Sequence, residues 1–163
     1  MLIVELIIIG VIVLFDQLTK IAAESILPTL PGGTYAVFPG FASFTYAENT
    51  GAAFSMFSNA TFLLGVIALA VAVVIFVVMV KSNKNKSKLL AISLSFLIGG
   101  AIGNVIDRFA LGYVRDMIQF TFVDFAIFNV ADSFASIGAV LLIIYLLFFF
   151  QRSEKKREEG QPL

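Results

Sequence analysis

The chain has 163 residues, 60% of them hydrophobic and 13% charged, with a mean hydropathy of +0.99. In a soluble domain charged residues alone make up about a quarter of the chain. We therefore expect an integral membrane protein folded as a single domain over residues 1–163. Its net charge of zero argues against a nucleic-acid-binding surface. The absence of histidine and cysteine excludes a Ser-His-Asp triad, a Cys-His pair, an HExxH zinc site and disulfides, and leaves acid–base chemistry to carboxylates, lysines and tyrosines.

The first predicted element is an apolar membrane span at about residues 2–22. It contains Asp16 and Lys20, which stand at i and i+4 and can therefore neutralise each other on one face of a helix. The stretch lacks a basic N-terminal region, so we expect a retained span and not a cleaved signal peptide. An alternative role for Lys20 is that of a base paired with a serine, although spacing singles out no serine.

Two later segments are predicted to be extended. Residues 41–47 are short, aromatic and flanked by turn residues, and residues 118–123 alternate large apolar with smaller or polar side chains. If they pair, they form a small sheet, which must lie at the membrane interface because hydrocarbon does not tolerate unpaired strand edges. Asn49, between the first of these segments and Gly51, is either a turn residue or a ligand for a peptide backbone.

Three further apolar spans are expected at about residues 61–80, 89–107 and 129–150, which gives four transmembrane helices in all. Lysines and arginines gather in the loop at 81–88 and in the C-terminal tail at 151–163. Because basic loops favour the cytoplasmic side, this pattern predicts cytoplasmic N- and C-termini and places the segments at about 23–60 and 108–128 on the outer side.

The outer end of the third span is rich in small and polar residues. Three glycines occur there, Gly99, Gly100 and Gly103, and they would let another helix approach closely. Asn104 and Arg108 follow at i and i+4. Arg108 is either the partner of the adjacent Asp107 in an interfacial ion pair or an anchor for phosphate or carbonyl groups of a lipidic substrate.

Asp116 and Asp132 are the strongest candidates for catalysis. On one continuous helix they would lie about 24 Å apart, so they can meet only if the chain turns back between them. Two carboxylates that share a site hold one proton between them, which is the arrangement an aspartyl protease needs to activate water and protonate the leaving group. The alternatives are a helix N-cap for Asp132 and a solvated loop position for Asp116, but ionisable residues at membrane depth favour function.

Two other classes of function stay open at this point. A small transporter or proton-coupled channel would use Asp16, Asp107, Asp116 and Asp132 as a relay, although the last three gather toward the outer side and no inverted repeat is present. A membrane chaperone that binds lipidated chains without cutting them would differ only in lacking turnover.

Taken in order along the chain, five motifs resemble those of the bacterial lipoprotein signal peptidase, or signal peptidase II, an aspartyl peptidase family. Any one of them is a weak signal, whereas five in order are specific. They are Asp16-Gln17-Leu18-Thr19-Lys20, Asn49-Thr50-Gly51-Ala52-Ala53-Phe54, the segment from Gly99 to Arg108, the segment from Val114 to Ile118, and the segment from Phe128 to Ser133.

This resemblance implies a four-helix inner-membrane endopeptidase with an extracytoplasmic β cradle. It would remove the signal peptide of prolipoproteins just before a cysteine that carries diacylglycerol, without a metal or organic cofactor, as a monomer among membrane lipids, and it would be a target of globomycin-type cyclic peptides. Asp116 and Asp132 match the catalytic pair, and Asp16 and Lys20 match a supporting pair. The positions that match the substrate site are Asn49, Gly51, Asn104, Arg108 and Asn129.

Arg115 departs from the family's pattern, in which the residue before the first catalytic aspartate is more often apolar. If its side chain points inward, a cation there would lower the pKa of Asp116 and change which carboxyl holds the shared proton.

Overall fold

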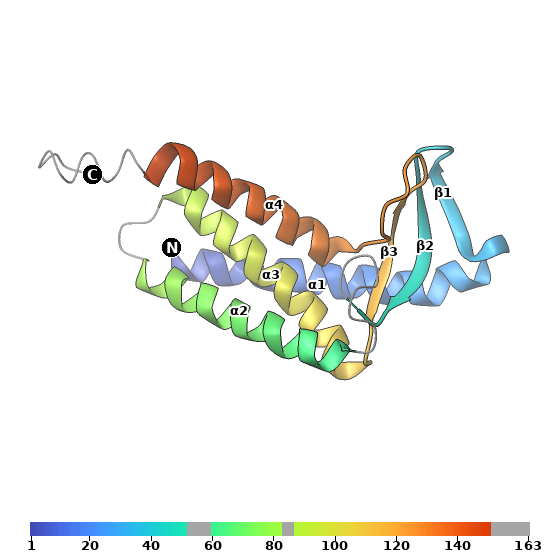
Figure 1. Cartoon of the computed structure of the whole chain (residues 1–163), viewed down its shortest axis with the longest axis horizontal. Helices are drawn as coiled ribbons and strands as arrows, with labels where there is room; N and C mark the ends of the chain where they lie inside the picture. The colour runs from blue at the N-terminus through green and yellow to red at the C-terminus, as the bar shows by residue number, and fades with distance from the viewer. Residues whose placement is uncertain (52–59, 83–86, 151–163) are drawn as a thin grey trace, which may run out of the picture.

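The computed structural model describes residues 1–51, 60–82 and 87–150, and its four long helices run side by side with a small sheet at one end (Figure 1). The helices are α1 (Leu2–Ile26), α2 (Thr61–Lys81), α3 (Lys88–Ala110) and α4 (Val130–Tyr145), the last continued by a π-helical turn at Leu146–Phe150. The strands are β1 (Thr34–Phe38), β2 (Ala42–Asn49) and β3 (Val114–Phe120). All four helices are long and apolar enough to cross a membrane, which confirms the predicted fold class.

Helix α3 lies at the centre and packs against α1, α2 and α4. Its glycines permit the close contacts that the sequence predicted. A Cβ atom on Gly99 would stand 3.0 Å from the Ile12 side chain of α1, and one on Gly100 would collide with the backbone oxygen of Ala131 in α4. In lipid, where neighbouring helices gain little from hydrophobic burial, such close backbone packing is a main source of association.

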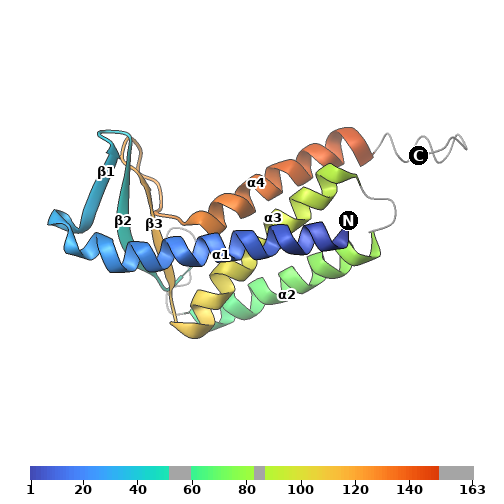
Figure 2. The same cartoon turned by 180° about the vertical axis from the view of Figure 1, so that it is seen from behind.

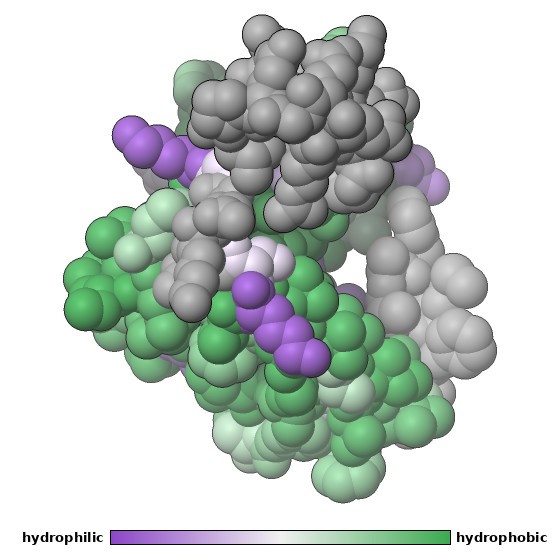
Figure 3. All heavy atoms as spheres, turned by 90° about the vertical axis from the view of Figure 1, so that its left-hand side faces the viewer, coloured by the Kyte–Doolittle hydropathy of each residue, from purple (hydrophilic) through white to green (hydrophobic). Residues whose placement is uncertain are grey.

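Helix α1 buries a narrow stripe and exposes the rest of its surface. The buried positions are Glu5, Ile9, Ile12, Asp16, Lys20 and Ala23. Their spacing of three or four residues places them on one face of a helix, which is why both charged residues of the motif face α3 and not the lipid. Figure 3, which looks along the molecule from the end that carries the N-terminus, shows hydrophobic residues over much of the helix surface in that view, as expected where acyl chains are the solvent.

The sheet stands at the end of the bundle away from the N-terminus and from the last turn of α4 (Figure 2). Its order is β1-β2-β3 with antiparallel pairing throughout. The predicted extended segment at 41–47 corresponds to β2. The other predicted segment, residues 118–123, was placed too far along the chain, because β3 begins at Val114 and residues 121–124 form a turn. Sequence alternation missed the start of β3 because Val114-Arg115-Asp116 places charged side chains on both faces of the strand.

The segment after β3 returns toward the helices and starts α4. Ile118 and Phe128 form an antiparallel bridge, in which the Ile118 amide donates to the Phe128 oxygen at 2.7 Å and the Phe128 amide donates back at 3.0 Å. This bridge supplies the reversal that the two aspartates require. The predicted positions Ala52 to Phe54, part of the basic loop at 83–86 and the tail at 151–163 lie outside the described residues.

Candidate active site

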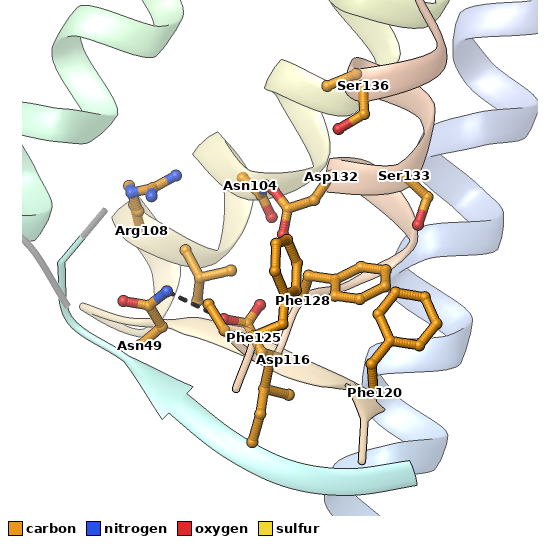
Figure 4. Close-up of a pocket in the computed structure, with 14 residues that line it drawn as sticks. Asn49, Asn104, Arg108, Asp116, Phe120, Phe125, Phe128, Asp132, Ser133 and Ser136 are labelled. Atoms are coloured by element: carbon orange, nitrogen blue, oxygen red, sulfur yellow. Dashed lines mark hydrogen bonds between the residues drawn. The ribbon is translucent and has the colours of Figure 1, made fainter. Parts of the chain in front are cut away.

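A cavity of about 480 Å³ opens where the ends of α3 and α4 nearest the sheet meet β2, β3 and the connection into α4 (Figure 4). Asp116 from β3 and Asp132 from α4 both line it, and in Figure 4 their carboxyl groups point into the same space. The other lining residues are Asn49, Asn104, Arg108, Val114, Phe120, Phe125, Ala126, Ile127, Phe128, Ser133, Ala135 and Ser136. The chain therefore brings the two aspartates into one cavity with three of the five residues that match the family's substrate site, Asn49, Asn104 and Arg108, whereas Gly51 and Asn129 are not among the lining residues.

Asp116 is 2% exposed and is held by amide groups on both carboxylate oxygens. Asn129 donates to Oδ1 at 2.6 Å, and Asn49 donates to Oδ2 at 3.0 Å. Asn49 reaches across from β2 because it sits diagonally to Asp116 on the same face of the sheet, where Ala47 is the direct partner of Asp116. The position of this carboxylate is thus fixed from two elements.

Asp132 lies in the first turn of α4 and takes part in a capping box. The N-cap is Asn129, whose side-chain oxygen accepts from the Asp132 N–H at 2.9 Å, while Asp132 Oδ2 accepts from the Asn129 N–H at 3.2 Å. The alternative role of Asp132 as the N-cap itself is therefore wrong, since Asp132 is the third helical residue. Its Oδ1 accepts from the Asn104 amide at 2.7 Å, which aims the carboxyl toward α3 and the cavity.

Burial is the largest cause that raises the pKa of Asp116, to about 6, and the neighbouring charge of Asp132 raises it further. The hydrogen bonds from Asn49 and Asn129 act in the opposite direction because they favour the charged form. A carboxyl group with a pKa near 6 exchanges its proton close to neutral pH, as a group in acid–base catalysis must.

Arg108 lines the same cavity from α3. Its Nη2 donates to the backbone oxygen of Gly51 at 3.3 Å, and the Gly51 amide in turn donates to the side-chain oxygen of Asn49 at 3.0 Å. Its buried Nε has no hydrogen-bond partner within the parts of the chain that the structure describes. A buried, unpaired guanidinium donor beside a cavity is a ready partner for an oxygen atom of a ligand.

Asp16 and Lys20 lie one layer behind the cavity and are fully buried. Lys20 Nζ lies 2.9 Å from Asp16 Oδ2 and 3.3 Å from Asp107 Oδ2, and it donates to Asn104 Oδ1 at 2.8 Å. Asp16 Oδ1 also accepts from the Ala131 amide at 2.9 Å. These contacts tie α1 to α3 and to the start of α4, and one of them holds Asn104, whereas Asp16 and Lys20 themselves do not line the cavity.

The sequence did not reveal the partners of Asp107 and Arg115. An ion pair with Arg108 was one of the two alternatives for this region, yet the Asp107 carboxylate accepts from Arg115 at 2.7 and 3.2 Å. Arg115 extends toward these groups and toward Glu24, whereas the next residue, Asp116, faces the cavity. The condition under which Arg115 would lower the pKa of Asp116 is thus not met. In the sequence, the only indication that Arg115 has a structural role was its place directly before Asp116.

Across residues 1–51, 60–82 and 87–150, no group of three or more acidic residues is arranged to hold a metal ion. The chemistry that the site itself offers is that of two adjacent carboxyl groups with amide and guanidinium donors around them.

The family model and the most similar relatives that we compared with this chain all indicate the same family. The family model of signal peptidase (SPase) II matches residues 8–148. The chain is 43% identical over 137 residues to a lipoprotein signal peptidase of Caldanaerobacter subterraneus subsp. tengcongensis, covering 84% of this chain and 91% of the relative. It is 42% identical to one of Trichormus variabilis, covering 79% and 80% of the two chains.

Solved structures agree. A bacterial membrane enzyme at 2.3 Å resolution superimposes with a TM-score of 0.75 at 32% identity, covering 88% of this chain and 87% of its own. A second, at 1.9 Å resolution, gives a TM-score of 0.73 at 32% identity, with 90% and 94% covered. The family match covers most of the chain and the relatives match over most of their length. The chain therefore belongs to the signal peptidase II family and is a multi-pass bacterial membrane protease.

Proposed function

We propose that this protease removes the signal peptide of prolipoproteins by hydrolysing the peptide bond just before a diacylglyceryl-modified cysteine, with Asp116 and Asp132 as the catalytic pair. The observation that carries the proposal is that two carboxyl groups from separate elements share one cavity, one of them with a pKa raised to about 6. The names of the relatives, lipoprotein signal peptidases, support the substrate class.

In the proposed reaction the pair holds one proton between its carboxyl groups. The ionised carboxylate takes a proton from a water molecule as that water attacks the scissile carbonyl carbon. The protonated partner donates to the carbonyl oxygen, and the tetrahedral intermediate then collapses as the leaving nitrogen accepts a proton. Products are a free carboxylate on the signal peptide and a free amine on the lipidated cysteine.

The donors around the pair have proposed roles in substrate binding. Arg108, with its unpaired Nε, would bind a substrate carbonyl oxygen, and Asn104 would hold the peptide backbone beside Asp132. Asn49 lines the cavity, Gly51 would hold Arg108 and Asn49 in place through its backbone, and Asn129 would fix the spacing of the carboxyl groups. The phenylalanines that line the cavity, Phe120, Phe125 and Phe128, suit an apolar chain that arrives from lipid.

We further propose that both termini are cytoplasmic and that the site faces the outer surface. Lys81 and Lys88 lie at the ends of α2 and α3 that point away from the sheet, and basic residues favour the cytoplasmic side. The substrate would then enter sideways from the bilayer, with its signal helix among the spans and its acyl chains in lipid. A monomer suffices for this arrangement, because one chain supplies both aspartates.

The deciding experiment incubates the purified protein with one prolipoprotein in two forms, with and without the diacylglyceryl group, and follows the products by mass. The Asp132→Asn variant tests the pair, and Asp124→Asn, an exposed aspartate in the turn after β3, is the matched control. We expect cleavage before the lipidated cysteine only, by the unmutated protein and by the control. Folded protein that cuts neither form would contradict the proposed function.

A further inference from the structure

Arg115 makes a set of contacts that the proposed reaction does not use. Its Nη1 donates to Glu24 at 3.0 Å and its Nη2 donates to Gln17 at 3.0 Å, both on α1. Its Nε and Nη2 grip the two carboxylate oxygens of Asp107, on α3, at 3.2 and 2.7 Å. The backbone amide of Arg115 also donates to Asp107, at 3.0 Å. One side chain of β3 thereby joins the strand to two different helices.

The interaction between Arg115 and Asp107 is a strong, charge-assisted one. Asp107 is fully buried, the Arg115 side chain is 8% exposed, and the planar guanidinium meets the carboxylate side-on through two nitrogens. Hydrogen bonds from Arg115 to Asp107 raise the pKa of the guanidinium, which stays charged at every working pH. Glu24 is 40% exposed on its side chain, so that arm of the contact is weaker.

Arg115 is also the residue next to Asp116, and neighbouring residues of a strand point to opposite faces. In the pairing of β2 with β3, Ala47 faces Asp116 and Glu48 faces Arg115. The face with Asp116 borders the cavity, and the face with Arg115 rests on α1 and α3. Whatever holds the Arg115 side chain in place therefore also sets the height and tilt of the Asp116 carboxylate.

A second chain of contacts runs from Arg115 toward the other aspartate. Asp107 is shared between Arg115 and Lys20, Lys20 donates to Asn104, and Asn104 donates to Asp132. Without Arg115, the buried Asp107 carboxylate would keep Lys20 as its cation and draw it away from Asn104. The aim of the Asn104 amide at Asp132 would loosen as a result.

We propose that Arg115 is a positioning residue, which clamps β3 to α1 and α3 from the face opposite the cavity and so holds Asp116 at the correct distance from Asp132. This inference rests on the proposed function, since it assigns Arg115 a role in turnover. A displacement of about 1 Å in a reacting group can lower a rate about a hundredfold, so a clamp of this kind has a measurable effect on catalysis.

The test compares Arg115→Met and Arg115→Lys with the unmutated enzyme on one lipidated prolipoprotein. Glu48→Gln is the control, because Glu48 is the exposed cross-strand neighbour of Arg115 on β2. We expect kcat per folded enzyme to fall by about ten- to a hundredfold in Arg115→Met with KM within about twofold, an intermediate kcat in Arg115→Lys, and no change in the control. A merely structural role would lower the yield of folded protein and leave kcat per folded enzyme unchanged, and that result would overturn the proposal.

Two further readouts keep the test decisive. If Arg115→Met does not fold, Arg115→Lys decides, because it keeps the charge and loses the two-nitrogen grip; a kcat equal to that of the unmutated enzyme would overturn the clamp. Hydrogen exchange of the β3 amides is independent of turnover, and we expect faster exchange in both variants with that of α2 unchanged. An unmutated enzyme that cleaves nothing refutes the proposed function, whereas unchanged exchange in β3 refutes the clamp.

Discussion

Asn129 and Asp132 cap each other at the start of α4: the side-chain oxygen of Asn129 accepts from the Asp132 amide at 2.9 Å, and Asp132 Oδ2 accepts from the Asn129 amide at 3.2 Å. The side-chain nitrogen of Asn129 also lies 2.6 Å from Asp116 Oδ1. The residue that begins the helix thus touches both carboxyl-bearing residues. A helix cap, which any fold needs for its own stability, is used here to space two acids.

Replacing either acid of the pair with its amide should abolish cleavage. Asp116→Asn and Asp132→Asn keep the size and most hydrogen bonds of the side chain but cannot take up or release the shared proton. We expect turnover to fall by about 10²- to 10⁴-fold or more, as measured by mass from the rate of release of the signal peptide.

The control for this prediction is Asp124→Asn, which removes an exposed carboxyl outside the cavity and should retain full activity. Thermal unfolding in detergent establishes that each variant is folded. A folded Asp116→Asn or Asp132→Asn protein with more than about a tenth of the normal rate would refute the assignment of that residue to the pair.

Substitutions of Asn129 can separate its role as the N-cap of α4 from its hydrogen bond to Asp116. Serine is also a good N-cap, so Asn129→Ser should keep α4 stable while losing the amide that holds Asp116, and we expect cleavage to fall about tenfold or more. Asn129→Ala loses both functions and should in addition unfold more easily, by about 1 kcal/mol. Thermal unfolding and cleavage rates measured on the same preparations check both parts. Equal rates in Asn129→Ser and the unmutated protein would show that the contact with Asp116 is unimportant.

Much of the fold follows from the positions of the apolar stretches along the chain. Apolar stretches of about 20 residues have few other stable arrangements, so the four helices could be placed to within a few residues of their observed bounds. The meeting of Asp116 with Asp132 could also be predicted, because only one reversal of the chain separates them. Glycines in α3 pointed correctly to close helix contacts.

What could not be predicted depends on partners that are distant in sequence. Arg115 reaches Glu24 and Gln17 across 91 and 98 positions, and no local pattern encodes such contacts. Strand β1 was missed for a related reason: its burial pattern is irregular, and it is a strand because β2 lies beside it. Pairing, and not propensity, decides such short edge strands.

Activity should depend on the proton of Asp116. Its pKa is raised to about 6 by burial and by Asp132, so the free enzyme loses the shared proton as the pH rises through this value. We expect kcat/KM to decline above about pH 6, by up to tenfold per pH unit, because kcat/KM reports the ionisation of the free enzyme. A pH profile on the lipidated substrate checks this, and a rate that climbs steadily from pH 6 to pH 8 would contradict it.

The same shift predicts a pH dependence of stability. The folded protein binds this proton more tightly than an unfolded aspartate with its pKa of 3.8, so the stabilisation is complete below about pH 3.8 and is lost as the pH rises through about 6. The difference between 3.8 and about 6 corresponds to at most about 3 kcal/mol. The midpoint of thermal unfolding in detergent should therefore be higher at pH 5 than at pH 7.5. Asp116→Asn should flatten this difference, and an unchanged slope in that variant would assign the dependence to other groups.

A methyl group on Gly103 should disturb the layer that supports the site. A Cβ atom there would lie 2.6 Å from Asp16 Oδ2 and 3.0 Å from the Ala131 side chain, so Gly103→Ala must push α1 or α4 away from α3. We expect a loss of about 1–3 kcal/mol in stability, together with slower cleavage because Asp16 holds both Lys20 and the start of α4.

The matched control is Gly10→Ala in α1, where nothing lies within 4 Å of the added atom. That variant should be as stable as the unmutated protein or about 1 kcal/mol more stable, since alanine favours a helix over glycine. Unfolding midpoints in detergent distinguish the two variants, and similar midpoints for both would show that contact at Gly103 does not limit the packing of these helices.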